Sequence, residues 1–389
     1  MQRGQITFTR TERVLFGQPV AEALPSEAER LGAERVFLLV SRTLNRESDV
    51  VARAREGLGD RFAGLCDHMP AHSPRDAVIA CAEQVREAGA DLLVNIGGGS
   101  TTDGAKAVTV CVSHGVREVA GLDAYVGSLD ENGLLRPAAF EPPTLPLICV
   151  PTTLSGGEFN PRAGITNPTI GRKQSIVNPG LAPRSVILDP AATRPTPEGL
   201  FLSTGIRAVD HAVEGFCSVN ANAYVDGSAL QALRLLTEGL PRVKADPDDL
   251  EARLQCQMGA WLSMAGPVLG VHMGASHAIG HILGGSAGVP HGHTSCVMLP
   301  AVLRYNAPVN GARQAALAAA MGQSEAPAAD LLHALIEGLG QPRRLAEVGV
   351  GEADFERLAA LCMHDAWTHS NPRTIAGPED VVDILRLAA

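Results

Sequence analysis

The sequence lacks the features expected of a membrane-spanning or nucleic-acid-binding protein. No uninterrupted apolar run approaches the roughly 18–20 residues that a membrane-spanning helix needs. Aromatic residues make up only 4% of the 389 residues, and 42 acidic residues against 32 basic ones give a net charge of −10. A surface that neutralises phosphates or stacks bases is therefore not expected, so nucleic acid and membranes are not expected partners. With 45% hydrophobic residues, the chain can bury a large core and is expected to fold as a soluble protein of one or two domains.

Paired cysteines and a secretory leader are also missing. None of the eight cysteines belongs to a CxxC pair, which favours reduced, mostly buried thiols. The opening segment MQRGQITFTRTERVLFG has neither an apolar core nor a small-residue cleavage site. We therefore expect a cytoplasmic protein. Lysine is scarce, because it occurs only at Lys106, Lys173 and Lys244.

Short apolar runs alternate with helical patterns in the first half of the chain. This alternation is typical of βαβ units on a doubly wound parallel sheet. The predicted strands are Arg35–Val40, Asp91–Ile96, Pro146–Val150 and Ser185–Asp189. Between the first two strands, Arg75–Ala88 repeats apolar residues at helical spacing and ends before a glycine. The sequence therefore predicts an α/β nucleotide-binding domain.

The second half has a different pattern. After about Pro190 the β-branched runs disappear, and long Ala/Leu/Met stretches such as 228–240 and 250–264 predict an all-helical domain. We place the domains at residues 1–194 and 195–389, with the Pro-rich segment TRPTPEGL at the junction. The polar segment 127–146 is expected to be a surface excursion.

A glycine-rich loop carries the strongest chemical signal of the first half. In DLLVNIGGGSTTDGAKAV, a strand runs into three glycines and then into a helix. Main-chain N–H groups can approach an anion there, and the helix N-terminus adds its positive end, so a pyrophosphate is the expected ligand. A plain tight turn is the alternative, because the motif is not GxGxxG. The candidate residues are Gly97, Gly98, Gly99, Ser100 and Asp103.

Two further loops follow predicted strands at the same expected edge of the sheet. Ser41 and Arg42 stand where an acidic residue would bind the ribose hydroxyls of NAD, so the extra phosphate of NADP is not excluded. A solvated loop arginine is the alternative. The segment CVPTTLSGGEFN places Thr152, Thr153 and Ser155 after another strand, where open α/β folds bind ligands. An ordinary polar loop would look similar.

Histidines cluster in the second half. Five of the twelve fall between residues 271 and 293, and His277 and His281 share a helix face at i, i+4 spacing. Arg207 and His211 have the same spacing on another predicted helix. Such histidines could bind a divalent metal or relay a proton. However, Arg207 stands where an Asp would complete the metal set, and a guanidinium would repel a cation. Single histidines in structural roles remain the alternative.

Taken together, these segments resemble the iron-containing, or group III, alcohol dehydrogenase family. The motifs RVLFG, GGGSTTDGAKAV, PTTLSGGE, GIRAVDHAVEG, SHAIGHILGGSAGVPHGHTSCVMLP and SNPRTIAGPEDVVDIL occur in the family's order along nearly the whole chain. The resemblance implies an α/β nucleotide-binding domain and a helical domain. In the metal-dependent branch, the Asp ligand is accompanied by three histidines that match His211, His277 and His291, while His281 matches an additional active-site histidine. Lys173 lies near a basic position that the family usually keeps.

The departure at Arg207 resembles the maleylacetate reductase branch, where the acidic ligand is also lost and no metal is used. The resemblance then implies an oxidoreductase of aromatic-compound degradation that uses NADH or NADPH to reduce a carbon–carbon double bond, giving 3-oxoadipate. We expect no metal, a small carboxylate substrate and a homodimer. The alternatives are a metal-dependent alcohol dehydrogenase using iron or zinc, and a nucleotide-binding protein without activity.

These interpretations assign specific roles to the second-half residues. Arg207 is expected to anchor a substrate carboxylate, and one of His277, His281 or His291 to supply the proton that accompanies hydride transfer. A surface arginine paired with Asp210 or Glu214 is the alternative for Arg207. If a metal binds after all, its expected ligands are His211, His277 and His291.

Overall fold

The computed structural model describes residues 5–129 and 135–389, which form two compact units. The α/β unit contains residues 8–129 and 135–196. The helical unit contains residues 197–389 together with residues 5–7. The domain boundary expected between residues 194 and 195 remains a proposal, which limited proteolysis of the chain can test.

A six-stranded parallel sheet forms the α/β unit, in the order β1-β10-β7-β4-β2-β3. Its strands are β1 (Arg13–Phe16), β10 (Ser185–Leu188), β7 (Leu147–Pro151), β4 (Leu92–Gly97), β2 (Val36–Val40) and β3 (Phe62–Cys66). The four strands expected from the sequence are confirmed to within one residue at each end. They were predictable because both faces are covered, so each strand is almost wholly apolar.

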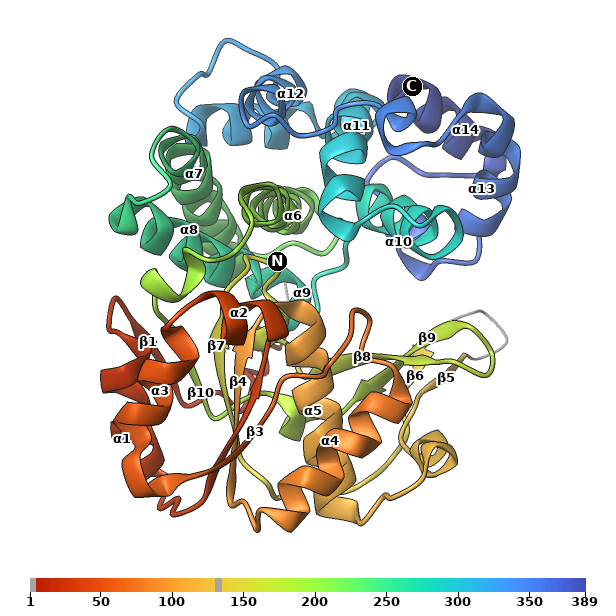
Figure 1. The fold of residues 1–389 in the computed structure, drawn as a ribbon. Helices are drawn as coiled ribbons and strands as arrows, with labels where there is room; N and C mark the ends of the chain where they lie inside the picture. Colours follow the sequence, from red (N-terminus) through yellow and green to blue (C-terminus); the bar gives the residue numbers. More distant parts are fainter. Residues whose placement is uncertain (1–4, 130–134) are drawn as a thin grey trace. The chain divides into compact units, whose positions relative to one another are not determined.

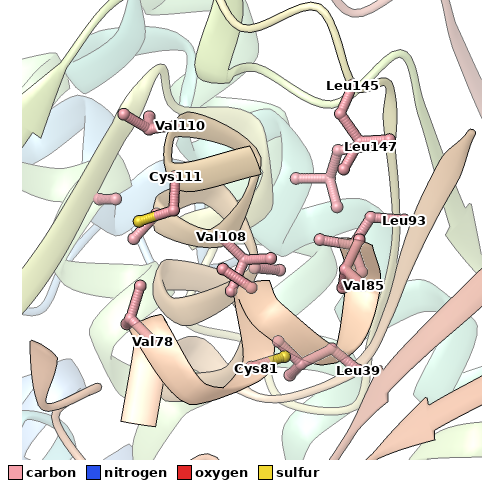
Figure 2. Close-up of a cluster of buried hydrophobic side chains, with 14 of the residues drawn as sticks. Leu39, Val78, Cys81, Val85, Leu93, Val108, Val110, Cys111, Leu145 and Leu147 are labelled. Carbon is pink, nitrogen blue, oxygen red and sulfur yellow. The ribbon is translucent and has the colours of Figure 1, made fainter. Parts of the chain in front are cut away.

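Helices cover both faces of this sheet. Alternate residues of β2 enter two separate cores, with Phe37 and Leu39 in one and Leu38 in the other. The first core packs α4 (Arg75–Glu87) and α5 (Gly99–His114) against the sheet, as Figure 2 shows. The second packs α1 (Val20–Arg30) and α3 (Val50–Leu58) against the other face (Figure 1). The expected helix Arg75–Ala88 is confirmed, and Gly89 follows it with a φ of 57°.

Smaller elements of the α/β unit were not expected from the sequence. The antiparallel hairpin of β8 (Arg162–Asn167) and β9 (Arg172–Val177) packs on α5. A second pair, β5 (Ser128–Leu129) and β6 (Leu135–Arg136), lies in the segment expected to be a surface excursion. Residues 130–134 of that segment lie outside the described residues. The short helix α2 (Arg42–Glu47) follows β2.

The described residues of the helical unit contain no strand, as expected. Its helices are α6 (Glu198–Cys217), α7 (Ala223–Ala245), α8 (Leu250–Ser263), α9 (Ala265–Val268), α10 (Ala275–Ala287), α11 (His291–Ala320), α12 (Ala328–Gly338), α13 (Phe355–Cys362) and α14 (Pro378–Leu387). Helix α6 packs against α7, α8 and α11, so its side chains are buried nearly all round. None of the described helices is both long and apolar enough to cross a bilayer.

Candidate active site

Loops that follow three neighbouring strands meet at the carboxyl edge of the parallel sheet. The Thr152 N–H donates to the Gly97 carbonyl at 3.0 Å, which ties the loop after β7 to the loop after β4. The Ser41 N–H donates to the Ile96 carbonyl at 3.1 Å, so the loop after β2 joins them. The structure therefore brings together the candidate cofactor residues of the three loops.

The three glycines at the junction of β4 and α5 are needed for close packing rather than for the turn itself. None of them has a positive φ. A Cβ at Gly97 would collide with Thr101 Oγ1, and one at Gly98 would lie 3.0 Å from Thr153 Cγ2. A Cβ at Gly99 would lie 3.3 Å from Ser155 Oγ. The glycines therefore allow this loop to pack closely against Thr101, Thr153 and Ser155.

An ion pair lies beside the first turn of α5. Lys173 Nζ on β9 is 3.3 Å from Asp103 Oδ2. The lysine stem crosses Gly164 on β8, where any Cβ would collide with Lys173 Cε. Gly164 therefore lets Lys173 reach the helix N-terminus, which places a cation near the predicted phosphate loop.

A strained segment makes hydrogen bonds to the same helix N-terminus. The sequence did not predict it. His72 and Ser73 have φ values of 65° and 47°, a region that non-glycine residues rarely adopt. The His72 N–H donates to Ser100 Oγ at 3.1 Å, and Ser73 Oγ donates to the Ser100 carbonyl at 2.6 Å. Because the strain is held by contacts between distant residues, no local pattern could have indicated it.

Arg42 is exposed but tethered to the end of β3. Its NH2 atom lies 2.6 Å from His68 Nδ1, and its Nε donates to the Asp67 carbonyl at 3.4 Å. Asp67 Oδ2 also accepts a hydrogen bond from the Asn45 amide at 3.0 Å. The guanidinium is therefore held at the carboxyl edge of the sheet, beside Ser41.

The second group of candidates lies in the helical unit. Arg207 and His211 are on α6, His277 and His281 on α10, and His291 begins α11. The His211 and His277 rings are 4.9 Å apart between centroids. Helices α6 and α10 thus bring together the two pairs that share i, i+4 spacing in the sequence.

Arg207 is a buried cation, with only 13% of its side chain exposed. Its NH1 donates to Ser295 Oγ at 3.1 Å and lies 3.8 Å from Asp210 Oδ2. Burial lowers the pKa of Arg207, while Asp210 and Glu214 oppose this shift. Arg207 therefore does not lie on the surface, but it does pair with Asp210, as the alternative expected.

His277 is fully buried and held by Glu214. Its Nδ1 lies 2.8 Å from Glu214 Oε2, while its Nε2 makes no hydrogen bond to the described residues. Burial, reinforced by the Arg207 charge, holds the pKa of His277 well below the usual value. Burial has the same effect on the pKa of His211, which is therefore also neutral at pH 7.

His281 and His291 are more accessible. His281 Nδ1 lies 2.9 Å from Asp365 Oδ2, and its ring faces Trp367 at 5.0 Å between centroids. His291 is exposed and packs on α10 at Gly284, where a Cβ would lie 3.1 Å from its ring. Asp365, Trp367 and Ser295 were missed from the sequence because long stretches of chain separate them from the residues they contact.

One group of side chains in the helical unit has metal-type ligand atoms close together. Atoms of Asp210, Glu214 and His277 lie within 4.8 Å of one another, whereas His211, His277 and His291 form no such group among the residues described. Both carboxylates already accept hydrogen bonds. Asp210 Oδ2 accepts from the Ser276 and Ser295 hydroxyls, and Glu214 accepts the Gly274 and Ser276 N–H groups. The guanidinium beside them opposes a divalent ion by charge repulsion, although Asp210 Oδ1 and His277 Nε2 are buried and have no hydrogen-bond partner among the described residues.

Comparison with known proteins places this architecture in one family. Residues 11–190 match the family described as iron-containing alcohol dehydrogenase, and residues 201–389 match the C-terminal region of the Fe-containing alcohol dehydrogenase family. The chain belongs to the iron-containing alcohol dehydrogenase family. It is therefore an oxidoreductase, and the resemblance seen in its motifs is confirmed.

Relatives of this iron-containing alcohol dehydrogenase family member cover almost all of its length. Maleylacetate reductase 2 of Cupriavidus pinatubonensis is 34% identical, over 97% of this chain and 94% of the relative. Dehydrogenase FUM7 of Gibberella moniliformis is 33% identical, over 97% and 96%. The crystal structure of maleylacetate reductase from Agrobacterium tumefaciens is 30% identical and superposes with a TM-score of 0.82, over 100% and 98% of the two chains. The similarity therefore extends to the maleylacetate reductase-like branch.

Proposed function

We propose that this protein is an NAD(P)H-dependent reductase of a carboxylate-bearing, unsaturated oxo acid, that it resembles maleylacetate reductase, and that it works without a metal. The buried Arg207 carries this proposal. Its charge lies beside His211 and His277, where it disfavours a metal cation and favours an anion. The similarity to maleylacetate reductases supports the same substrate class.

The α/β unit has the residues to hold a dinucleotide. The pyrophosphate would bind at Gly97–Ser100, where glycines and the α5 N-terminus present N–H groups. Asp103, Lys173, Thr152, Thr153 and Ser155 surround this loop. NADPH is as acceptable as NADH, because Arg42 and Ser41 offer no carboxylate to repel a 2′-phosphate. The bound nicotinamide would supply the hydride.

The helical unit has groups that could bind the substrate, stabilise its developing charge and donate a proton. Reduction of a conjugated double bond builds negative charge on the carbonyl oxygen of the oxo acid. Arg207 would bind a substrate carboxylate and stabilise that charge. Of the three candidate proton donors, His281 and His291 are the more accessible, whereas burial and the Arg207 charge keep His277 neutral, with His211 packed beside it. The cytoplasmic homodimer expected from the sequence stays a prediction.

A metal-dependent alcohol dehydrogenase is the second candidate. The proximity of Asp210, Glu214 and His277 favours it, because two carboxylates and an imidazole are suitable ligands. It is less well supported, since Arg207 lies nearby and hydroxyl or N–H donors engage three of the four carboxylate oxygens, all but Asp210 Oδ1.

Two substitutions of Arg207 test the proposal, one through carboxylate binding and the other through metal affinity. Arg207→Ala should raise the KM for maleylacetate at least tenfold, because an ionic hydrogen bond to the carboxylate is lost. Arg207→Asp should abolish the reduction and create affinity for Fe²⁺ or Zn²⁺, because it replaces the repelling guanidinium by a carboxylate on the face of α6 that carries His211. Steady-state kinetics and metal titration measure these outcomes. Full activity of Arg207→Ala would contradict the proposal.

A further inference from the structure

A hydrogen-bonded row of three side chains lies in the interior of the helical unit, running from Arg207 through Ser295 to Asp210. Arg207 NH1 donates to Ser295 Oγ at 3.1 Å, and Ser295 Oγ donates to Asp210 Oδ2 at 2.6 Å. A guanidinium can only donate, and although burial beside Glu214 raises the pKa of Asp210 to about 7, Oδ2 of that carboxyl accepts from the hydroxyls of Ser295 and Ser276. The single proton of the Ser295 hydroxyl must therefore point to Asp210, and its lone pair to Arg207.

Ser295 lies between the Arg207 guanidinium and the Asp210 carboxyl and keeps these two groups apart. Arg207 NH1 is 3.8 Å from Asp210 Oδ2, longer than a hydrogen bond, and Ser295 bonds to both. An arginine beside a buried carboxylate would otherwise form a two-pronged pair with it, which is the favoured geometry for these groups. Such a pair would occupy the donors that a substrate carboxylate needs.

The other nitrogen atoms of the Arg207 guanidinium are available to bind a ligand. Within the described part of the chain, Nε and NH2 of Arg207 make no hydrogen bond, and 13% of the side chain is exposed. Ser276 also donates to Asp210 Oδ2, at 2.9 Å, which fixes the carboxylate from a second side.

We infer that Ser295 is a positioning residue that holds Arg207 away from Asp210 and thereby keeps its free donors for a substrate carboxylate. The inference rests on the proposed function and specifies how the anion site is maintained. Without the hydroxyl, Arg207 turns onto Asp210 and the site loses its affinity for carboxylates, while the groups that move the proton stay in place.

Kinetics of Ser295→Ala test this role. We expect the KM for maleylacetate to rise about tenfold, with kcat within about twofold and the KM for NADH unchanged, because only carboxylate binding is impaired. The matched control is Ser263→Ala, which removes another buried hydroxyl of the same unit that donates only to the Ala260 carbonyl at 2.7 Å. This control should match wild type.

A double-mutant cycle separates positioning from a general structural effect. On an Arg207→Ala background, Ser295→Ala should change the KM for maleylacetate no further, because there is no guanidinium left to position. An equal rise on both backgrounds, or wild-type kinetics of Ser295→Ala, would overturn the inference. If Arg207→Ala itself leaves KM unchanged, the proposed function fails instead.

The crystal structure of Ser295→Ala gives a readout that does not depend on the substrate. It should show Arg207 paired directly with Asp210 at hydrogen-bond distance. An unmoved guanidinium would refute the positioning role, even if wild-type protein does not reduce maleylacetate and the proposed function is abandoned.

Discussion

At the scale of single residues, two buried ionisable groups, Lys106 and Glu158, lie at the loop that follows β7. Lys106 on α5 is fully buried, and its Nζ donates to the Gly157, Asn160 and Arg162 carbonyls at 2.6, 2.6 and 3.0 Å. Glu158 in the same loop is also buried, and burial raises its pKa to about 7 although Lys106 opposes the shift. The loop therefore carries an acid that is protonated in the folded protein below about pH 7.

Glu158 predicts a specific dependence of stability on pH. Between about pH 4.5 and 7 the unfolded chain loses this proton while the folded chain keeps it, so stability falls as pH rises through this range and then levels off. The contribution is about 3 kcal/mol. Glu158→Gln should remove it. Thermal midpoints at pH 5 and pH 8 measure the effect: the drop should be smaller in the variant, and equal drops would contradict the assignment.

The sequence allowed the candidate residues to be chosen, but not all of their partners. The i, i+4 spacing of Arg207 with His211 and of His277 with His281 places each pair on one helix face, and the structure shows both. Ser295 and Asp365 were not predicted, because they contact Arg207 and His281 only after the helices have packed. Spacing along a helix is local information, whereas these contacts depend on the tertiary structure.

At the scale of elements, the close approach of two loops can be tested by adding one methyl group. Gly98→Ala places a Cβ 3.0 Å from Thr153 Cγ2 and should push the loop after β7 away from the glycine loop. We expect the KM for NADH to rise about tenfold because the N–H groups no longer converge on the pyrophosphate.

Gly157→Ala is the matched control, since no atom lies within 4 Å of the added Cβ and the φ of Gly157 is not positive. This variant should bind NADH as wild type does. Fluorescence titration with NADH measures both affinities. Unchanged affinity in Gly98→Ala would show that the cofactor is bound elsewhere.

The sequence predicted some elements better than others, for a physical reason. Strands β2, β4, β7 and β10 are buried on both faces and therefore appear as apolar runs. The hairpin β8–β9 was missed because β9 carries the polar segment RKQS and pairs with β8 in a sheet of two strands rather than in the large sheet. Lys173 on this hairpin nevertheless reaches Asp103, a contact that only the tertiary fold creates.

At the scale of the whole molecule, the net charge makes a local cation necessary. A chain with a net charge of −10 repels anionic substrates at long range. Affinity for a carboxylate must then come from a cation held at the site, and Arg207 is the buried cation of the histidine cluster. The iron-containing alcohol dehydrogenase fold is thus compatible with an anion site in place of a metal.

The metal content of active wild-type protein tests the central claim most directly. Elemental analysis after purification and dialysis against a chelator, combined with kinetics on maleylacetate, measures it. The account predicts far less than one Fe or Zn ion per chain and an unchanged kcat after chelation, because Arg207 disfavours a cation beside His211 and His277. One tightly bound ion per chain, with activity lost on its removal and restored on its return, would contradict the account and favour the metal-dependent alcohol dehydrogenase.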